Sequence, residues 1–243
     1  MEIVNLIPMA GEGSRFKKEG YLLPKPLIPV NGIPMIVRAL KSLPKAQKNI
    51  LIVRKDQINV SDLKKVLGKY FQNIKIIEID YLTEGQAVTC LLAEKEVPKG
   101  VVLNVGACDV GFEYDNSKYY STIEKYGAFI WTYNQNLNVL KNPEMYGWVK
   151  LSDEDKIDYV SCKKPISKDL INDHVVSGTF TFKDSDLFFQ SITKMIHSGD
   201  RVNNEFYLDN IFNHLSIDSG VFKVDSYNSW GTPSELNSYY EKI

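Results

Sequence analysis

The stretch that decides the fold is Ile7-Pro8-Met9-Ala10-Gly11-Glu12-Gly13-Ser14-Arg15-Phe16, with Leu23-Pro24-Lys25-Pro26-Leu27-Ile28-Pro29-Val30 shortly after it. Residues 2–9 (EIVNLIPM) are an apolar run, which predicts a short buried strand that opens onto a flexible loop. Gly11 and Gly13 let backbone N–H groups approach a polyphosphate, and Ser14 and Arg15 add further donors. The segment therefore predicts an anion-binding loop after a strand.

Two common nucleotide motifs do not fit this loop. Phe16 stands where a dinucleotide fingerprint has its third glycine. No Gly-Lys-Ser or Gly-Lys-Thr follows, as a Walker A loop requires. The loop must therefore be interpreted together with the Pro-Lys-Pro segment that follows it.

Strand-like and helix-like runs alternate through the first half of the chain. Strands are predicted at 2–9, 50–53, 74–79, 101–105 and 128–132, and amphipathic helices at 35–42, 62–71, 86–94 and 116–126. This alternation is typical of a largely parallel sheet. Ligands of such sheets bind beyond the carboxyl ends of the strands, here the loops after Met9, Ile79 and Val105.

The second half has a mixed α+β pattern. We predict strands at 148–151, 156–161 and 175–182, helices at 185–196 and 205–214, and a C-terminal helix capped by Thr232 or Ser234. No Pro-rich or Ser-rich linker separates this half from the first. The sequence therefore predicts a single domain over 1–243, made of a 1–140 part and a 141–243 part.

Composition narrows the classes of partner and location. At 243 residues, 44% of them hydrophobic, the chain can bury one sizeable core. A net charge of -1 favours neither nucleic acid nor an acidic membrane, so a small-molecule partner is expected. Three scattered cysteines fit a reducing compartment, and no apolar run approaches the roughly 20 residues of a membrane span. We expect a soluble, cytoplasmic protein.

The pair of motifs Gly-x-Gly-x-Arg and Pro-Lys-Pro-Leu resembles the signature of the nucleotidyltransferases that make nucleotide sugars. The string from Ile7 to Ile36 looks like the branch associated with bacterial capsule polysaccharide biosynthesis, and the likeness returns at 163–167, 202–207 and 230–233. The resemblance implies a GT-A-like (Rossmann-like) α/β fold, with a mostly parallel sheet flanked by helices. Its 1–140 part would bind the nucleotide, and its smaller α+β part, 141–243, would bind the acceptor.

The same resemblance implies an activity of EC 2.7.7 type. Such an enzyme uses Mg²⁺ to transfer a nucleoside monophosphate from a nucleoside triphosphate to a phosphorylated acceptor, and it releases pyrophosphate. CTP is the favoured donor, and the acceptor is a sugar phosphate or phosphoglutamine, as in capsule phosphoramidate synthesis. The implied partners are therefore the two substrates, and a homo-oligomer remains open.

Catalytic roles can be carried over to Arg15, Lys25 and Asp109. The resemblance implies that Arg15 holds the β- and γ-phosphates and that Lys25 neutralises the α-phosphate region, where charge develops in the transition state. The stretch around Gly85 matches the part that contacts the base. The nucleotide-binding residues expected in this way are Met9, Ala10, Gly11, Glu12, Gly13, Ser14, Arg15, Lys25, Glu84, Gly85 and Gln86.

Asp109 is the expected metal ligand. It follows the predicted strand 101–105, where the family keeps an aspartate for Mg²⁺, a cation that prefers oxygen ligands. A second family aspartate stands two residues before the glycine of Gly-Thr-Pro, but this position is Ser229. Asp225 is the nearest carboxylate in the sequence, so Asp109 and Asp225 are the expected metal ligands.

Acceptor binding is expected in the second half. Lys164 matches the lysine of the family's Glu-Lys-Pro motif, although Lys163 occupies the glutamate position. Glu205 and Asp209, four residues apart, share one face of the predicted helix. The expected acceptor-binding residues are Lys163, Lys164, Gly178, Glu205, Asp209 and Trp230.

Two other functions compete with this hypothesis. A glycosyltransferase of similar fold would present Asp-x-Asp at the central strand end, whereas the chain has Cys108-Asp109-Val110-Gly111. A nucleotide-binding module without catalysis is supported by Lys163 and Ser229, which replace two family carboxylates. Pyrophosphate release with any acceptor separates the enzyme from the module.

Overall fold

Strand β1 (Ile3–Met9) lies inside the main sheet, between the parallel strands β4 (Lys48–Arg54) and β6 (Val102–Val105). The computed structural model describes residues 1–152 and 154–241. The sheet has nine strands, and its main path runs β10-β9-β11-β6-β1-β4-β5, with β8 and β12 joined beside β11. The remaining bounds are β5 (Ile74–Ile79), β8 (Ala128–Tyr133), β9 (Gly147–Leu151), β10 (Ile157–Cys162), β11 (His174–Phe182) and β12 (Ser219–Lys223).

The sheet is parallel in its first half. Strands β6, β1, β4 and β5 run parallel, whereas each antiparallel pair of the main sheet contains β9, β10 or β11. Because β11 pairs directly with β6, both halves of the chain contribute to one continuous sheet. The predicted α/β fold with flanking helices is confirmed.

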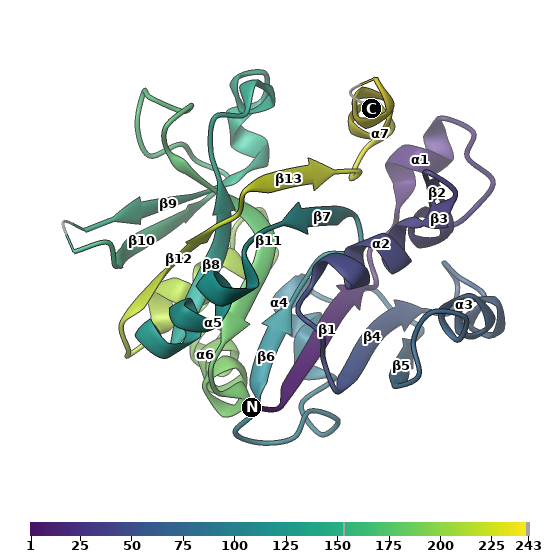
Figure 1. Ribbon diagram of the computed structural model, residues 1–243, viewed down its shortest axis with the longest axis horizontal. Coiled ribbons are helices and arrows are strands. Elements are labelled where there is room, and N and C mark those ends of the chain that lie inside the picture. The colour runs from purple at the N-terminus through teal and green to yellow at the C-terminus, as the bar shows by residue number, and fades with distance from the viewer. Residues whose placement is uncertain (153, 242–243) are drawn as a thin grey trace.

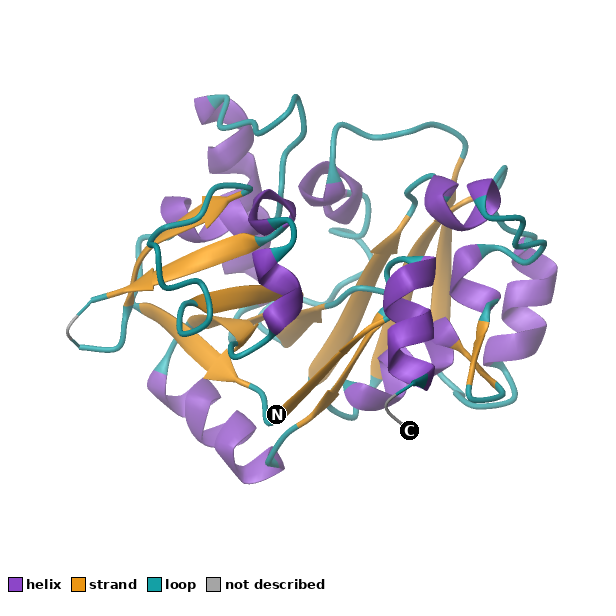
Figure 2. Cartoon of the chain, turned by 90° about the horizontal axis from the view of Figure 1, so that it is seen from above, coloured by secondary structure: helices purple, strands orange, loops and turns teal. Residues whose placement is uncertain are grey.

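Helices cover both faces of the sheet (Figure 2). Alternate residues of β1 point to opposite faces. Val4 and Leu6 pack in the core shared with α4 (Gln86–Leu91) and α6 (Ser185–Ser198). Ile3 and Ile7 pack on the other face, in the core shared with α2 (Met35–Ser42), α3 (Val60–Leu67) and α5 (Asn116–Lys125). The nearly unbroken apolar run in β1 reflects this burial on both faces.

Short elements build the upper rim of the molecule in Figure 1. Strands β7 (Val110–Glu113) and β13 (Ser226–Ser229) pair antiparallel, although more than a hundred residues separate them. The other elements are α1 (Ser14–Lys18), η1 (Lys25–Leu27), β2 (Pro29–Val30), β3 (Ile33–Pro34), η2 (Leu137–Leu140), η3 (Pro143–Met145), η4 (Asp209–His214) and α7 (Pro233–Tyr240). The β7–β13 pair places the C-terminal segment above the carboxyl ends of β1 and β6.

The predicted helix over 205–214 is wrong in its first part. Glu205 and Val202 exchange backbone hydrogen bonds of 3.0 Å, so this segment forms a tight turn. Only η4 is helical, as a 3-10 helix from Asp209. The predicted N-cap Thr232 is confirmed for α7, because its side chain accepts a hydrogen bond from the Glu235 N–H.

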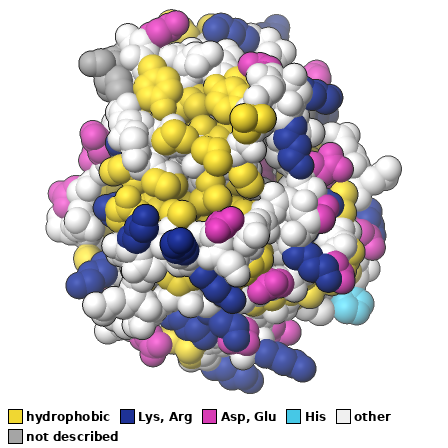
Figure 3. Space-filling view, turned by 90° about the vertical axis from the view of Figure 1, so that its right-hand side faces the viewer, with side chains coloured by type: hydrophobic (Ala, Val, Ile, Leu, Met, Phe, Trp, Pro, Cys, Tyr) yellow, Lys and Arg dark blue, Asp and Glu magenta, His cyan; other side chains and the backbone are white. Residues whose placement is uncertain are grey.

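Figure 3 shows apolar side chains gathered on the side that lies to the right in Figure 1. Leu22 is 99% exposed, and Leu23 is half exposed beside it. These two side chains line a shallow apolar hollow with Tyr21, Ile28, Pro29, Leu236 and Tyr240. Of the helices in the described ranges, none has the length and apolarity that crossing a membrane demands.

Candidate functional site

The glycine loop connects β1 to α1. Gly13 has a φ of 59°, in the left-handed region that glycine adopts without a Cβ penalty, and it is the N-cap residue of α1. The space where Gly11 would carry a Cβ is open to at least 4 Å. Ala10 is buried in the core, so the loop presents mainly backbone to the cleft in front of it.

Lys25 is held by a proline-flanked turn. The Leu27 N–H donates to the Pro24 carbonyl at 2.8 Å, and Pro24 and Pro26 restrict the backbone on either side of Lys25. The turn directs the Lys25 ammonium to Asp109, where Nζ lies 2.5 Å from Oδ2. About a fifth of each side chain is exposed, 19% for Lys25 and 20% for Asp109. The two residues that were expected to act on the phosphates and the metal therefore form one ion pair.

The charge on Lys25 is maintained by its surroundings. Burial by itself lowers the pKa of Lys25, but the Asp109 carboxylate more than compensates, so the pKa lies above its usual value. Lys25 is therefore a permanent cation at neutral pH. Burial raises the pKa of the neighbouring Cys108 thiol to about 12, so this cysteine is protonated and does not act as a nucleophile.

The glycine loop and Lys25 form the wall between two cavities, which together we call the glycine-loop cleft. The first lobe, of about 180 Å³, extends to Asp109, and the second, of about 450 Å³, extends to Arg15. Both lobes are lined by Gly11, Glu12, Gly13 and Lys25. The first lobe also contains Met9 and Gln86, and the second contains Ser14, Thr83, Glu205 and Gly231.

The predicted base-contacting stretch is only partly directed to this cleft. Gln86 lines the first lobe, whereas the Glu84 carboxylate pairs with Arg201 outside it. Gly85 has a φ of 119°, and a Cβ there would lie 2.6 Å from the Phe206 carbonyl oxygen. Gly85 is thus required for close approach of the segment around Phe206.

Sequence reasoning missed the outer boundary of the first lobe. Gln57, in the segment after β4, accepts a hydrogen bond of 2.5 Å from Lys17 Nζ of α1. Both residues line the lobe. Their types and spacing carry no motif, and only the position of Gln57 after a parallel strand indicated that it lies at the binding edge.

Gly178 lies close to the loop that carries Asp109. It has a φ of 82° in an irregular part of β11, and a Cβ there would lie 3.7 Å from Cβ of Ala107. The buried hydroxyls of its neighbours Ser177 and Thr179 have no hydrogen-bond partner within the described chain. Unpaired buried hydroxyls are costly, so this segment has unused hydrogen-bonding capacity near the cleft.

The other predicted acceptor residues do not assemble into one pocket. Lys163 Nζ donates to the Met145 carbonyl oxygen at 2.6 Å, and Lys164 is exposed. Asp209 packs against Gly147, so closely that a Cβ on that glycine would lie 2.0 Å from Asp209 Oδ2. Burial raises the pKa of Asp209 to about 6, although the nearby Lys163 lowers it. Glu205 lines the second lobe.

Two predicted roles need correction. Trp230 is 3% exposed and packs in a core cluster with Phe16 and Leu236, so its ring cannot stack on a ligand. Asp225 is exposed at the far end of β13, where its N–H donates to the Glu113 carbonyl. In the β7–β13 register Ser229 is opposite Val110, next to Asp109, while Asp225 is four residues away. At about 3.3 Å per residue, a small shift cannot bring Asp225 to Asp109.

The Glu235 carboxylate lies near the Asp109 carboxylate, whereas Asp225 lies at the other end of β13. A Cβ on Gly231 would lie 3.1 Å from Asp109 Oδ2, 3.2 Å from Glu235 Oε2 and 3.6 Å from Ser229 Oγ. In the sequence Glu235 belongs to Thr-Pro-Ser-Glu at 232–235, a pattern typical of a helix start. The sequence therefore predicted a helix start there and no role for Glu235 in the site. Within the described ranges, no group of three or more His, Cys, Asp and Glu side chains converges on one point.

A tyrosine-lined pocket adjoins Ser229 and Glu235. Tyr133 and Tyr227 stack with their ring centroids 3.9 Å apart, and Tyr146 lies across the pocket from α7. The pocket continues into an open polar groove of about 1050 Å³, which reaches Lys118 and Lys223. The tyrosine-lined pocket itself is small, at about 40 Å³, and Asp109 lines neither it nor the groove.

The sequence was compared with family models and with curated proteins. No family model matches the chain. The bifunctional protein GlmU of Methanocaldococcus jannaschii is 27% identical over 239 residues, which cover 95% of this chain and 52% of that protein. The chain therefore spans about half the length of the curated relative that it matches.

Solved structures resemble the whole chain. A nucleoside-diphosphate-sugar pyrophosphorylase from Vibrio cholerae RC9 has a TM-score of 0.78 at 19% identity, covering 98% of this chain and 99% of its own. The inositol-1-phosphate CTP transferase from T. maritima has a TM-score of 0.74 at 15% identity, covering 98% of this chain and 93% of its own. At these identities the likeness shows a common fold.

Proposed function

We propose that this chain is a Mg²⁺-dependent nucleotidyltransferase. It transfers a nucleoside monophosphate from a nucleoside triphosphate to the phosphate of a small acceptor and releases pyrophosphate. The observation that carries the proposal is the arrangement of Gly11, Gly13, Arg15, Lys25 and Asp109 around one cleft. These residues supply donors and cations for a triphosphate together with a carboxylate for a metal.

The triphosphate fits the division of the cleft into two lobes. The nucleoside occupies the first lobe, near Gln86, and the phosphate chain passes the glycine loop toward Arg15 in the second lobe. Backbone N–H groups of the loop bind the phosphate oxygens without a side chain between them. Arg15 then holds the leaving pyrophosphate, whose negative charge grows in the transition state.

Lys25 stands between the two lobes, at the α-phosphate. Its flexible stem lets the ammonium follow the phosphorus as the bond to the pyrophosphate breaks. The pKa of Lys25 is raised by its pairing with Asp109, which favours its charged form. The same ammonium lies 2.5 Å from Asp109 Oδ2.

The donor set at Asp109 fits a hard divalent cation. The Lys25 ammonium shows that a positive charge is accommodated at Asp109 Oδ2, and Ser229 Oγ adds a second oxygen nearby. Gly231 leaves room that any Cβ would fill. When bound there, Mg²⁺ would neutralise phosphate charge and make the α-phosphorus more electrophilic.

No protein nucleophile or general base is required. A phosphate monoester has a second pKa of about 6, so the acceptor oxygen that attacks is already ionised at neutral pH. The protein need only hold the acceptor in line with the bond that breaks. The place that we propose for the acceptor is the tyrosine-lined pocket next to Ser229 and Glu235, together with the larger groove that continues from it, and the tyrosine hydroxyls can bind acceptor oxygens.

The compared proteins support this reaction class. The names of two structural neighbours specify a nucleoside-diphosphate-sugar pyrophosphorylase and a CTP transferase for inositol 1-phosphate. CTP is the donor that we propose, and a sugar phosphate or phosphoglutamine is the acceptor. The role in bacterial capsule biosynthesis rests on the sequence resemblance alone.

The proposal is tested by following pyrophosphate. Purified protein and Mg²⁺ are incubated with CTP, UTP, dTTP, ATP or GTP against a panel of sugar phosphates and phosphoglutamine. One pair that releases pyrophosphate only when both substrates are present supports the proposal. Tight nucleotide binding with no pyrophosphate from any pair would favour the non-catalytic module. In a parallel incubation with nucleotide sugars, release of a free nucleoside diphosphate would favour the glycosyltransferase.

A further inference from the structure

The reaction centre lacks one carboxylate at the position where the sequence resemblance expects it. Ser229, at the end of β13, lies opposite Val110 and next to Asp109 in the paired strands. Its hydroxyl is a neutral oxygen, which neutralises none of the charge of a divalent cation. With Asp225 at the far end of β13, Asp109 would be left as a single anionic ligand.

Glu235 supplies a carboxylate at this place from a different element. Its Oε2 and Asp109 Oδ2 lie 3.2 and 3.1 Å from the same point, the position of a Cβ on Gly231. The two oxygens are therefore no further apart than the sum of these distances. Because residue 231 is glycine, it places no side chain of its own between them.

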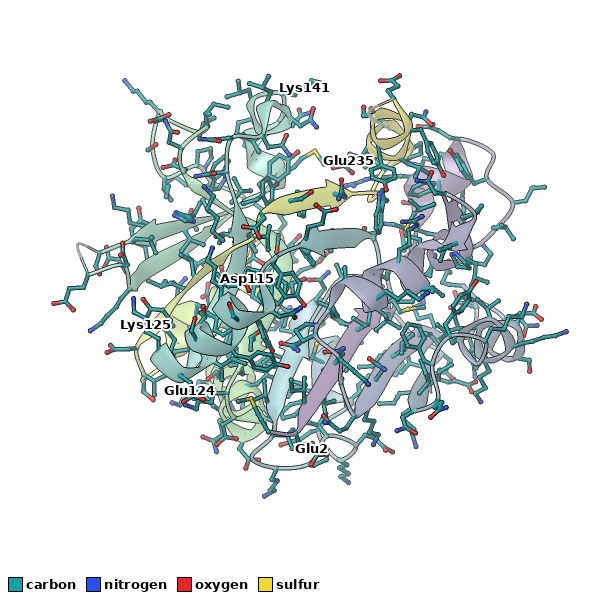
Figure 4. The ribbon with its side chains drawn as sticks, in the orientation of Figure 1. Glu2, Asp115, Glu124, Lys125, Lys141 and Glu235 are labelled. Carbon is teal, nitrogen blue, oxygen red and sulfur yellow. The ribbon has the colours of Figure 1, made fainter. Side chains whose placement is uncertain are left out.

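The orientation of Glu235 is fixed by the start of α7. The Thr232 hydroxyl accepts from the Glu235 N–H at 3.2 Å, and it lies 3.0 Å from Oε2, to which it donates. This reciprocal arrangement holds the carboxylate at the first turn of the helix. Figure 4 labels Glu235 on the side of α7 that faces β13.

The Glu235 carboxylate affects two tyrosine hydroxyls of the adjoining pocket. Burial first, and then the Glu235 carboxylate, raises the pKa of the Tyr146 hydroxyl across the pocket. Tyr227 has a raised pKa for the same reason, with burial as the main cause and the carboxylates of Asp109 and Glu235 as further causes. Two carboxylates thus act on one region, and among the described residues Lys25 is the cation that pairs closely with one of them, Asp109.

We propose that Glu235 is the second carboxylate ligand of the divalent cation at Asp109 and takes the role for which Ser229 has no charge. The inference rests on the proposed function. Mg²⁺ binds oxygens at about 2.0–2.1 Å in octahedral geometry, so neighbouring ligand oxygens lie about 3 Å apart. Rotation of the Glu235 side chain toward Asp109 would bring the two oxygens to this spacing, and Gly231 has no Cβ to oppose it.

The test measures metal binding directly, without turnover. Mn²⁺ is titrated into the protein and followed by electron paramagnetic resonance of the free ion, with Mg²⁺ as competitor. Glu235→Gln keeps the size of the side chain and an oxygen for the Thr232 hydroxyl, so α7 stays capped. We expect this variant to bind Mn²⁺ at least about tenfold more weakly, since loss of even an outer partner of a metal site has such effects.

Two further variants make the result specific. Asp225→Asn removes the carboxylate that lies at the far end of β13, and Mn²⁺ affinity should not change. Gly231→Ala keeps both carboxylates but puts a methyl group 3.1 Å from one and 3.2 Å from the other, so Mn²⁺ affinity should fall. Circular dichroism and melting temperature verify that each variant is folded.

The outcomes separate this inference from the proposed function. Unchanged Mn²⁺ affinity in Glu235→Gln, with weaker binding in Asp109→Asn, overturns the role of Glu235 and leaves the reaction in place. Weaker Mn²⁺ binding in Asp225→Asn, together with unchanged Mn²⁺ binding in Glu235→Gln, would also overturn the role of Glu235. Failure of the proposed function would appear elsewhere, as absence of pyrophosphate release by the wild-type protein.

Discussion

Lys25 Nζ lies 2.5 Å from Asp109 Oδ2, although the two residues are 84 positions apart in the sequence. Each is held by its own loop, Lys25 by the proline-flanked turn and Asp109 by the segment after β6. Within this pair each charge neutralises the other, which reduces the cost of keeping both partly buried. A triphosphate and a divalent cation together can replace this pair, since one supplies negative charge for Lys25 and the other positive charge for Asp109.

Asp109→Asn should lower kcat/KM by about 10²-fold or more, because the proposed metal site loses its principal anionic ligand. The side chain keeps its shape, so the fold should persist. Steady-state kinetics with the active substrate pair give the value. The control is Asp158→Asn, which removes an exposed carboxylate from β10 and should retain normal turnover. Near-normal turnover of Asp109→Asn would contradict the proposed metal role.

Arg15→Ala should also lower kcat/KM by about 10²-fold or more, with a clear loss in kcat, because the leaving pyrophosphate gains charge in the transition state. Arg15 is exposed and lines the second lobe, so its removal leaves no buried gap. Lys18→Ala deletes an equal charge from the same short helix and should be silent. A rise in KM with kcat unchanged would mean that Arg15 binds the ground state and the transition state equally well.

Gly85→Ala should destabilise the protein by about 3 kcal/mol or more. Its φ of 119° and ψ of 172° belong to a region that is essentially confined to glycine, and a Cβ would collide with the Phe206 backbone at 2.6 Å. Gly100→Ala is the matched control, because Gly100 has a φ of 69° but open space around it. Chemical unfolding of both variants separates the collision from backbone strain. Equal losses would show that Phe206 moves aside.

Asp209 should make the protein less stable as pH rises from about 4 to about 6. Burial raises its pKa in the folded state to about 6, above the unfolded value of about 3.9, so the folded state binds more protons in this window. The contribution to the free energy of unfolding is therefore full below about pH 4, and about 3 kcal/mol is lost above pH 6. Urea unfolding of wild type and Asp209→Asn at both pH values measures it.

The Asp209→Asn variant should lack the loss of stability between about pH 4 and pH 6, so it should gain stability relative to wild type as pH rises. Lys163→Met should extend the window upward, because Lys163 lowers the pKa of Asp209. An identical pH dependence in wild type and Asp209→Asn would assign the effect to other groups.

Much of the fold was predictable because long amphipathic or apolar runs reflect burial. Helix α2 agrees with its predicted range of residues 35–42, and β5 agrees with 74–79. The short strands β7 and β13 were not predicted, because four residues show little periodicity and the two strands, which pair with each other, are distant in sequence. The segment from Glu205 failed because its backbone pairs with Val202 and Glu84, contacts that sequence spacing does not show.

The candidate site was predictable where a motif fixes backbone geometry. The glycine loop, Lys25 and Asp109 meet around one cleft, as the order of parallel strands and loops predicts. Glu235 was missed because its sequence context has a sufficient local explanation as a helix cap. Trp230 was misassigned because composition does not tell a ligand-stacking ring from one that fills the core.

The fate of the α-phosphate tests the central claim most directly. The active substrate pair is incubated with a nucleoside triphosphate that carries ³²P at the α position, and the products are separated by chromatography. The proposed transfer predicts that the label enters a new phosphoanhydride with the acceptor, while the β- and γ-phosphates leave together as unlabelled pyrophosphate. Label that stays in the triphosphate, or that appears only in free nucleoside monophosphate, would contradict it.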